Sequence, residues 1–519
     1  MKRTLIVAAL ALCAATPATA AADDAMASCE EPHEIDRYQL LRRLSLDLRD
    51  KIPSVDEYEA LDGEEGVPGA TIQEYLESDD FRQAMRRYHE KAFWPNVSTV
   101  RLNGTNTALA LKDGPALRIS SGSRAKVFRG VTDATCGDFE QTQFDPAFPG
   151  EHRPKPGSPE GWRMVSPYWD PANPVKVCAY DAQETLKAGT KDCKTADANS
   201  EKACGCGPNL RFCYGPSSVT SKAVLSAFRE QLNRSVDEVV AGGAPYTDLL
   251  LSTKAQQNGT IAFWKTNLAS NPALALTYDL PDADEEILDK EFGDDTWAPV
   301  DRKGLHAGVL TLPGYLLRFQ TDRGRANRMR ITMTCEYFVP PAKMEPAPGC
   351  QPDGNDLTKR CNCQYCHEKL EPLASYFASF AEAGTTFMDE AAGFPTKKDS
   401  CVGSASAFCR RFYVTQEDAH NPGSLLALQW ADDHPEYTDN AASGPRALAQ
   451  QIIDDGTFAH CTVRKTFAHF VKRDIRAQGA ESDELDLLEE LAKGFEQSTY
   501  DFAWLVREIV NLPQYRRVR

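Results

Sequence analysis

The chain has 519 residues, a formal net charge of −17 at pH 7 and 16 cysteines. A chain of this length can form several domains, each with its own hydrophobic core, so folding does not require a cofactor. The acidic charge disfavours nucleic acid and anionic membranes as partners, because both bind basic protein surfaces. The number of cysteines is typical of an exported protein, so a disulfide is the default interpretation of any single cysteine.

The first 20 residues have the pattern of a secretory signal peptide. Two basic residues precede an apolar run over residues 5–15, and Ala18-Thr19-Ala20 provides the small side chains that signal peptidase requires. We therefore expect a bacterial protein that is periplasmic or secreted. The apolar run is too short to span a bilayer and no run of ~20 apolar residues follows, so we expect no transmembrane segment beyond the signal peptide.

Residues 21–99 are expected to form an N-terminal helical module. Within residues 36–50, four leucines recur at helical spacing with charged residues between them, which predicts an amphipathic helix. Ser54-Val-Asp-Glu57 and Thr71-Ile-Gln-Glu74 have the spacing of capping boxes, in which a hydroxyl and a carboxylate satisfy free backbone amides at a helix start. Two further helices are therefore expected in this module.

Residues 100–220 are rich in Gly, Pro, Ser and Cys and have few periodic apolar runs. This composition predicts an irregular, disulfide-rich insertion with only short strands. Five cysteines lie close enough to pair there, although spacing does not fix which ones pair. Zinc binding is the alternative, which the lack of a histidine among them disfavours. The five are Cys178, Cys193, Cys204, Cys206 and Cys213.

Helical periodicity returns in two further modules, over residues 221–345 and 431–519. The first begins with a long helix expected over residues 221–242. In the second module we expect three helices. The first contains FAHCTVRKTFAHFVKR, the second starts at Ser482, and the last is capped by Ser498-Thr-Tyr-Asp501. The chain is therefore expected to be mainly α.

Between these two modules, residues 346–430 contain Cys363-Gln-Tyr-Cys366-His367, a C-x-x-C-H motif. In c-type haem attachment, two thiols with this spacing form thioethers to the porphyrin and the adjacent histidine becomes an axial iron ligand. The motif therefore predicts one covalent haem c, with His367 as the proximal ligand. Two alternatives remain open: a disulfide from Cys363 to Cys366, and a zinc knuckle that adds Cys361 to the motif's ligands.

The sixth position on the iron decides what such a site does. A methionine there suits electron transfer, a second histidine lowers the potential, and an open position admits peroxide or oxygen. Three residues are candidates for this distal ligand: His306, Met388 and Met344. Each has a structural alternative, because buried histidines often stabilise helix ends and methionines often fill packing gaps.

The cysteine count gives a consistency test. Without the signal-peptide Cys13 and the two haem cysteines, 13 remain, so at least one thiol has no disulfide partner. Cys401 and Cys409 are expected to form a local pair.

The run YCHEKLEPLASYFASFAEAG resembles the C-x-x-C-H-x-x-[IL]-[DE]-P-L pattern of the large secreted cytochrome-c-like proteins of planctomycetes and myxobacteria. The chain departs from the usual pattern at Glu371, where Asp is commoner, and at Ala374, where Gly is commoner. Blocks similar to that family also occur at residues 40–61, 245–252 and 306–319, and in the last module. Together the similar blocks cover about half of the mature chain.

The resemblance implies a fold of helical domains of unknown function around one haem segment, interrupted by the insertion. It also implies that Cys335 and Cys461, which both lie in similar blocks, clamp the last module to the haem region. Within the family, the block containing His306 precedes the haem motif. The resemblance implies architecture, export and haem better than it implies a reaction.

Three functions are compatible with the sequence. The first is an extracytoplasmic monohaem c-type cytochrome that exchanges electrons with a redox partner protein. The second is a haem-dependent oxidase or peroxidase with an open sixth iron site. The third is a secreted disulfide-rich binding or structural protein without haem. Motifs of serine hydrolases, zinc proteases and phosphate-binding loops do not occur.

Overall fold

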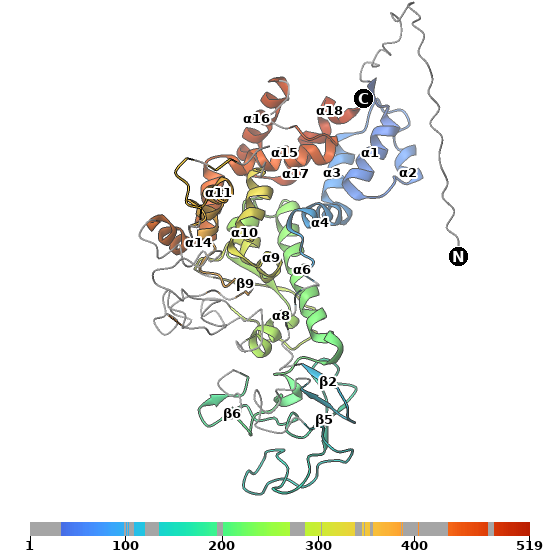
Figure 1. Cartoon of the computed structure of the whole chain (residues 1–519). Helices are drawn as coiled ribbons and strands as arrows, with labels where there is room; N and C mark the ends of the chain where they lie inside the picture. Colours follow the sequence, from blue (N-terminus) through green and yellow to red (C-terminus); the bar gives the residue numbers. More distant parts are fainter. Residues whose placement is uncertain are drawn as a thin grey trace, which may run out of the picture.

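The computed structural model describes residues 33–97, 108–119, 134–194, 201–269, 286–302, 304–337, 356–382, 434–475 and 482–518, with a few short stretches between them. The expected signal peptide lies outside these residues. Helices dominate the described part and strands are short, so the expectation of a mainly α chain is confirmed. Figure 1 shows an elongated molecule in which helices gather at one end and the sheet-containing insertion lies at the other.

The first amphipathic helix forms as the leucine pattern predicts. Helix α1 (Arg37–Arg49) begins after Asp36, whose carboxylate accepts hydrogen bonds from the backbone amides of Tyr38 and Gln39. The four leucines of the predicted apolar face, Leu40, Leu41, Leu44 and Leu48, are buried. The helix ends at Asp50, which adopts a left-handed conformation and donates its backbone amide to the carbonyl of Leu46.

One of the two expected capping boxes is present. Ser54 and Glu57 cap each other's backbone amides at the start of α2 (Val55–Glu59). The expectation for Thr71 and Glu74 is wrong, because α3 (Gly69–Glu77) starts three residues earlier than that capping box would place it, directly after Pro68. Thr71 therefore lies inside the first turn, where its own amide already bonds to the carbonyl of Pro68. Helix α4 (Asp79–Phe93) follows, capped by the Ser78 hydroxyl.

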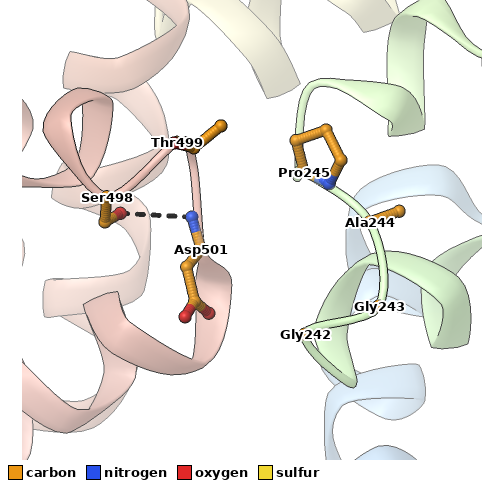
Figure 2. A pocket seen from close by; sticks show the side chains of 7 residues that line it. All are labelled: Gly242, Gly243, Ala244, Pro245, Ser498, Thr499 and Asp501. Atoms are coloured by element: carbon orange, nitrogen blue, oxygen red, sulfur yellow. Dashed lines mark hydrogen bonds between the residues drawn. The ribbon is translucent and has the colours of Figure 1, made fainter.

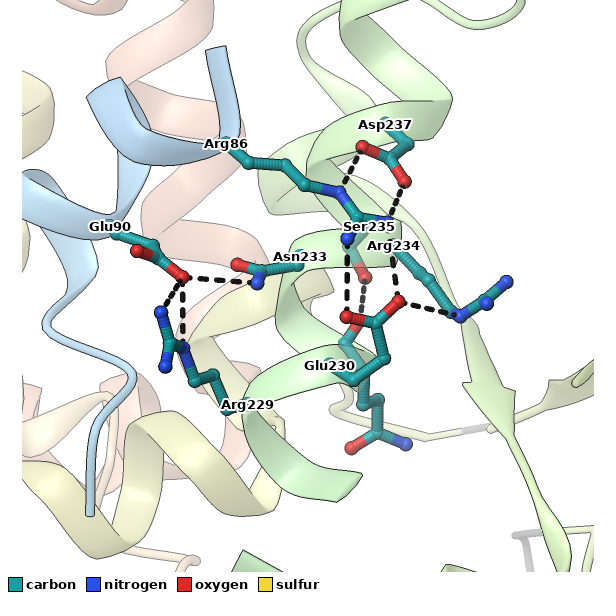
Figure 3. Close-up of polar contacts among 9 residues, drawn as sticks. Arg86, Glu90, Arg229, Glu230, Asn233, Arg234, Ser235 and Asp237 are labelled. Carbon is teal, nitrogen blue, oxygen red and sulfur yellow. Dashed lines mark hydrogen bonds and ion pairs between the residues drawn. The ribbon is translucent and has the colours of Figure 1, made fainter. Parts of the chain in front are cut away.

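The long helix α6 (Val219–Val240) runs against α4, and ion pairs join the two helices (Figure 3). Nε of Arg86 on α4 donates to Asp237 at 2.7 Å, and the same guanidinium contacts Glu230 at 3.2 Å. Arg229 on α6 contacts Glu90 on α4 at 2.7 Å. Partly buried ion pairs joined in a network fix the register of the two helices better than isolated surface pairs do.

The C-terminal helices lie beside the N-terminal ones. They are α14 (Pro435–Asp454), α15 (Thr457–Val471), α16 (Ser482–Gln497), α17 (Phe502–Asn511) and α18 (Pro513–Arg516). Strands β1 (His33–Glu34) and β10 (Arg517–Val518) pair antiparallel, so the two ends of the described chain meet.

The expected cap of α17 needs correction. Asp501 is the N-cap and accepts from the amides of Ala503 and Trp504, whereas Ser498 accepts from the amide of Asp501. The two residues between them have positive φ, so the chain turns before the helix begins.

A single hydrophobic core contains residues from all of these helical segments. It includes Leu44 of α1, Phe81 of α4, Leu232 of α6, Phe467 of α15 and Val506 of α17, all with no exposed surface. We call the helices that share this core the helical body. Segments more than 400 residues apart in the chain therefore depend on one another for burial.

The middle of the chain adds short elements to the body. They are α7 (Asp248–Leu251), β8 (Lys254–Gln257), α8 (Gly259–Phe263), β9 (Ala298–Asp301), α9 (Pro313–Arg318), α10 (Asp322–Met329) and α11 (Gln364–Ser375). Residues 264–268, 308–311 and 330–334 form single turns of 3-10 or π helix. Strands β8 and β9 pair antiparallel.

The described residues of the insertion, 108–119, 134–194 and 201–214, contain a small mixed sheet in the order β2-β3-β5-β4. The strands are β2 (Leu109–Leu111), β3 (Leu117–Ile119), β4 (Trp162–Val165) and β5 (Val175–Cys178), and a separate hairpin joins β6 (Lys187–Ala188) to β7 (Lys191–Asp192). A second core, in which Tyr214 accepts a hydrogen bond from the Trp264 indole, joins the insertion to the body.

Three disulfides cross-link the insertion, as its composition predicts. Every one of the five cysteines named for this region is paired, and Cys136 is the sixth partner. The pairs are Cys136–Cys178, Cys193–Cys204 and Cys206–Cys213. The zinc alternative for these cysteines is therefore wrong.

Within the part of the chain that the structure describes, no helix combines the length and the apolar character needed to cross a bilayer.

Candidate functional site

The C-x-x-C-H motif lies at the start of helix α11. Cys363 is the N-cap residue, and Cys366 and His367 lie in the first turn. The backbone amide of His367 bonds to the carbonyl of Cys363 at 3.1 Å, so the helical turn closes within the motif. The two thiols and the imidazole therefore project from one turn of helix, as the spacing predicts.

Cys363 and Cys366 differ from the other cysteines that the structure describes. Both are thiols and both are partly exposed, whereas the other ten described cysteines form five disulfides. Five disulfides are typical of a protein that folds in an oxidising environment. The disulfide between Cys363 and Cys366, one of the open alternatives, is not formed.

The zinc alternative at this motif loses one of its ligands. Cys361 pairs with Cys350, so it cannot supply a thiolate. No group of three or more metal-binding side chains occurs anywhere among the residues described. The pairing of Cys350 with Cys361 instead closes a loop directly before α11.

His367 is held through one ring nitrogen. Its Nδ1 is in hydrogen-bonding contact with Oε1 of Glu371, one turn later on α11. Glu371 has no exposed surface, and the same Oε1 accepts a hydrogen bond from Nε of Arg323 on α10 at 2.5 Å. Nε2 of His367 has no hydrogen-bond partner among the described residues, and it is the nitrogen that remains to bind a metal.

Two neighbouring helices fix α11 (Figure 1). On the α10 side, Arg325 is fully buried and donates to the carbonyls of Phe380 and Ala381, which follow α11. On the α14 side, the amide of Asn440 donates to the Ser375 hydroxyl at 2.9 Å. The motif helix is therefore held on both sides by buried or partly buried polar contacts.

A buried acid and a histidine lie close to the same helix. Nε2 of His434 contacts Oδ2 of Asp356 at 3.0 Å, and its Nδ1 contacts Glu436 at 3.1 Å. Burial opposes ionisation of Asp356, but hydrogen bonds from Thr358 and His434 outweigh it and lower its pKa to about 2. Burial also opposes the charged form of His434, which would lower its pKa. Its two carboxylate partners outweigh burial and raise that pKa above the ordinary value. Both nitrogens of His434 are thus engaged in ion pairs.

The candidate distal ligands are only partly described. His306 is 5% exposed, and its ring lies 5.6 Å from the ring of Phe380 and 6.0 Å from that of Phe387. It therefore packs against the segment that follows α11. Met344 and Met388 lie outside the described residues, as do Cys401 and Cys409, so those assignments stay predictions.

Two of the cavities that the described residues form lie away from the motif. One, of about 270 Å³, lies between the end of α6 and the turn before α17 and is lined by Gly242, Pro245 and Asp501 among others (Figure 2). The other, of about 640 Å³, lies in the insertion and is lined by Phe148, Arg153 and neighbouring residues. Neither contains a residue of the C-x-x-C-H motif.

Two side chains of the site were not among the sequence candidates: Glu371 as the partner of His367, and Arg323. The first had a local signal, because residues i and i+4 lie on the same face of a helix. Arg323 is 48 residues from Glu371 and had none. The pairing of Cys335 with Cys461, which the family resemblance implied, is confirmed.

The residues present fit a c-type haem. Two thiols with the required spacing are outside the disulfides, and the adjacent imidazole has one nitrogen engaged and the other without a described partner. Comparisons of the chain with models of protein families, with curated proteins and with solved structures found no match, so the resemblance to secreted cytochrome-c-like proteins stays a prediction.

Proposed function

We propose that the chain is an extracytoplasmic c-type cytochrome that carries one covalent haem and takes part in electron transfer with a redox partner protein. In this proposal Cys363 and Cys366 form the two thioethers and His367 is the proximal iron ligand. The haem supplies a one-electron couple when it is bound.

One observation carries the proposal: Cys363 and Cys366 are the two described cysteines that are not in disulfides. An oxidising compartment favours closure of nearby thiols, and the five other pairs are closed. Two thiols left on the first turn of α11, next to an imidazole, are the donor set that haem attachment requires.

The rest of the chain's contribution is positional. Helices α10 and α14 hold α11, and the Cys350–Cys361 disulfide limits the loop that enters it. Partial exposure of both thiols and of His367 leaves this face of α11 accessible. Electron exchange with another protein needs a cofactor that the partner can approach, and an accessible face of α11 allows this.

The experiment is expression of the exported protein together with cytochrome c maturation proteins. We expect a reduced-minus-oxidised spectrum of haem c, colour that survives denaturation, and a mass increase of one haem. A Cys363→Ala/Cys366→Ala variant should lose covalent haem, whereas Cys193→Ala/Cys204→Ala, which removes a disulfide in the insertion, should keep it. Colourless wild-type protein with the mass of the bare polypeptide contradicts the proposal.

The enzyme alternative separates from electron transfer in the same preparation. Cyanide or carbon monoxide that binds the haem without displacing a protein ligand indicates an open sixth position, and so an oxidase or peroxidase. If either ligand binds only slowly, with loss of a ligand band, a protein side chain occupies that position.

A further inference from the structure

We infer that Glu371, anchored by Arg323, is a positioning residue for His367 that lowers the reduction potential of the site. The inference rests on the proposed function, because it concerns the bound haem. Glu371, which contacts His367, lies outside the C-x-x-C-H motif.

The geometry selects one tautomer of His367. Oε1 of Glu371 already accepts from Nε of Arg323, and an ionised carboxylate can accept hydrogen bonds but not donate them, so Nδ1 of His367 carries the proton that faces Glu371. Nε2 is then the nitrogen with a free lone pair, which is the form a metal ligand needs. The contact also fixes the rotation of the ring relative to α11.

Burial makes this contact strong. Glu371 has no exposed surface, so water does not compete for its Oε1. Burying a carboxylate is costly unless a cation is close, and Arg323 supplies one at 2.5 Å. Arg323 comes from α10, which is separately fixed to the segment after α11 through Arg325. The carboxylate of Glu371 would therefore stay in place when the imidazole of His367 binds the haem iron.

The consequence is electronic. A carboxylate that accepts the Nδ1 proton makes the imidazole a stronger donor through Nε2. A stronger donor stabilises ferric more than ferrous iron, so the potential falls. Glu371 thus tunes the couple without touching the iron.

The test compares Glu371→Gln with Glu368→Gln in the haem-loaded protein. Gln keeps the size of the side chain and removes the charge, while Glu368 is an exposed glutamate on the same helix and is the matched control. We expect both variants to keep covalent haem. Glu371→Gln should shift the reduction equilibrium about tenfold toward the ferrous state, about 59 mV for one electron. Glu368→Gln should leave the potential close to that of the wild type.

The outcomes separate the two proposals. Equal potentials in both variants and the wild type overturn the role of Glu371 while the haem assignment stands, whereas a wild-type protein without covalent haem overturns the proposed function itself. If Glu371→Gln does not fold, Glu371→Asp takes its place, because it keeps the charge and shortens the reach by one methylene. A potential unchanged in that variant also overturns the inference.

Discussion

The helical body and the insertion are held together in different ways. The body buries side chains from segments throughout the chain in one hydrophobic core, and one disulfide in it joins cysteines 126 residues apart. The insertion has several small cores and three disulfides that span 7 to 42 residues. A region with little apolar surface to bury depends on local cross-links, whereas the disulfide in the large core of the body joins distant segments.

The largest difference is expected from disulfide removal. Closing a longer loop restricts the unfolded chain more, so Cys335→Ala/Cys461→Ala should lower the unfolding free energy by about 4–5 kcal/mol. The Cys206–Cys213 disulfide closes a loop of only 7 residues, so Cys206→Ala/Cys213→Ala should cost about 2 kcal/mol. Denaturant unfolding monitored by helical circular dichroism measures both. Equal losses would show that the two regions use disulfides in the same way.

A core truncation tests the body alone. Leu44 has no exposed surface, so Leu44→Ala should cost about 3–4 kcal/mol through lost burial and the cavity left behind. Leu46 on the same helix is 38% exposed, and Leu46→Ala should change stability by less than about 0.5 kcal/mol. A similar cost for both variants would mean that the face assigned to the core is wrong.

Acid should weaken the body more than the insertion, whose disulfides do not titrate. His89 donates from Nδ1 to the carbonyl of Met85 and accepts at Nε2 from the Tyr246 hydroxyl, and burial lowers its pKa to about 4. The unfolded chain takes up this proton near pH 6.5, so it binds more protons than the folded chain between these values. Stability should therefore fall by about 3 kcal/mol as the pH drops from 6.5 to 4.

Urea unfolding at several pH values checks this expectation. A His89→Phe variant should make the profile shallower but not flat, because burial also lowers the pKa of His469 to about 4 and that group remains. His460 is about half exposed, and His460→Gln should leave the profile unchanged. A profile that is equally steep without His89 assigns the acid sensitivity to other groups.

The smallest effect distinguishes the two expected capping boxes. Ser54→Ala removes an acceptor for the amide of Glu57 and should cost about 1 kcal/mol. Thr71→Ala removes no cap, because Thr71 lies inside α3, and should cost much less. Thermal unfolding of the two variants measures the difference, and a larger loss for Thr71→Ala would restore the capping box that the sequence predicted.

Part of the candidate site could be predicted from local spacing. The motif gave Cys363, Cys366 and His367, and the structure places all three on one turn of α11. A local signal also existed for Glu371, four residues after His367. Arg323 could not be found, because its contact depends on how α10 packs against α11.

The sequence by itself determined the elements that depend on neighbouring residues: the buried leucine face of α1, the cap at Ser54, the C-x-x-C-H turn and the presence of disulfides in the insertion. Only the tertiary structure decided the partner of Cys136, the single core shared by both ends of the chain, and the Arg323–Glu371 contact behind His367. Helical periodicity and capping are set within a few residues, so they can be read locally. Pairings between distant segments follow from packing of the whole chain, which local spacing does not encode.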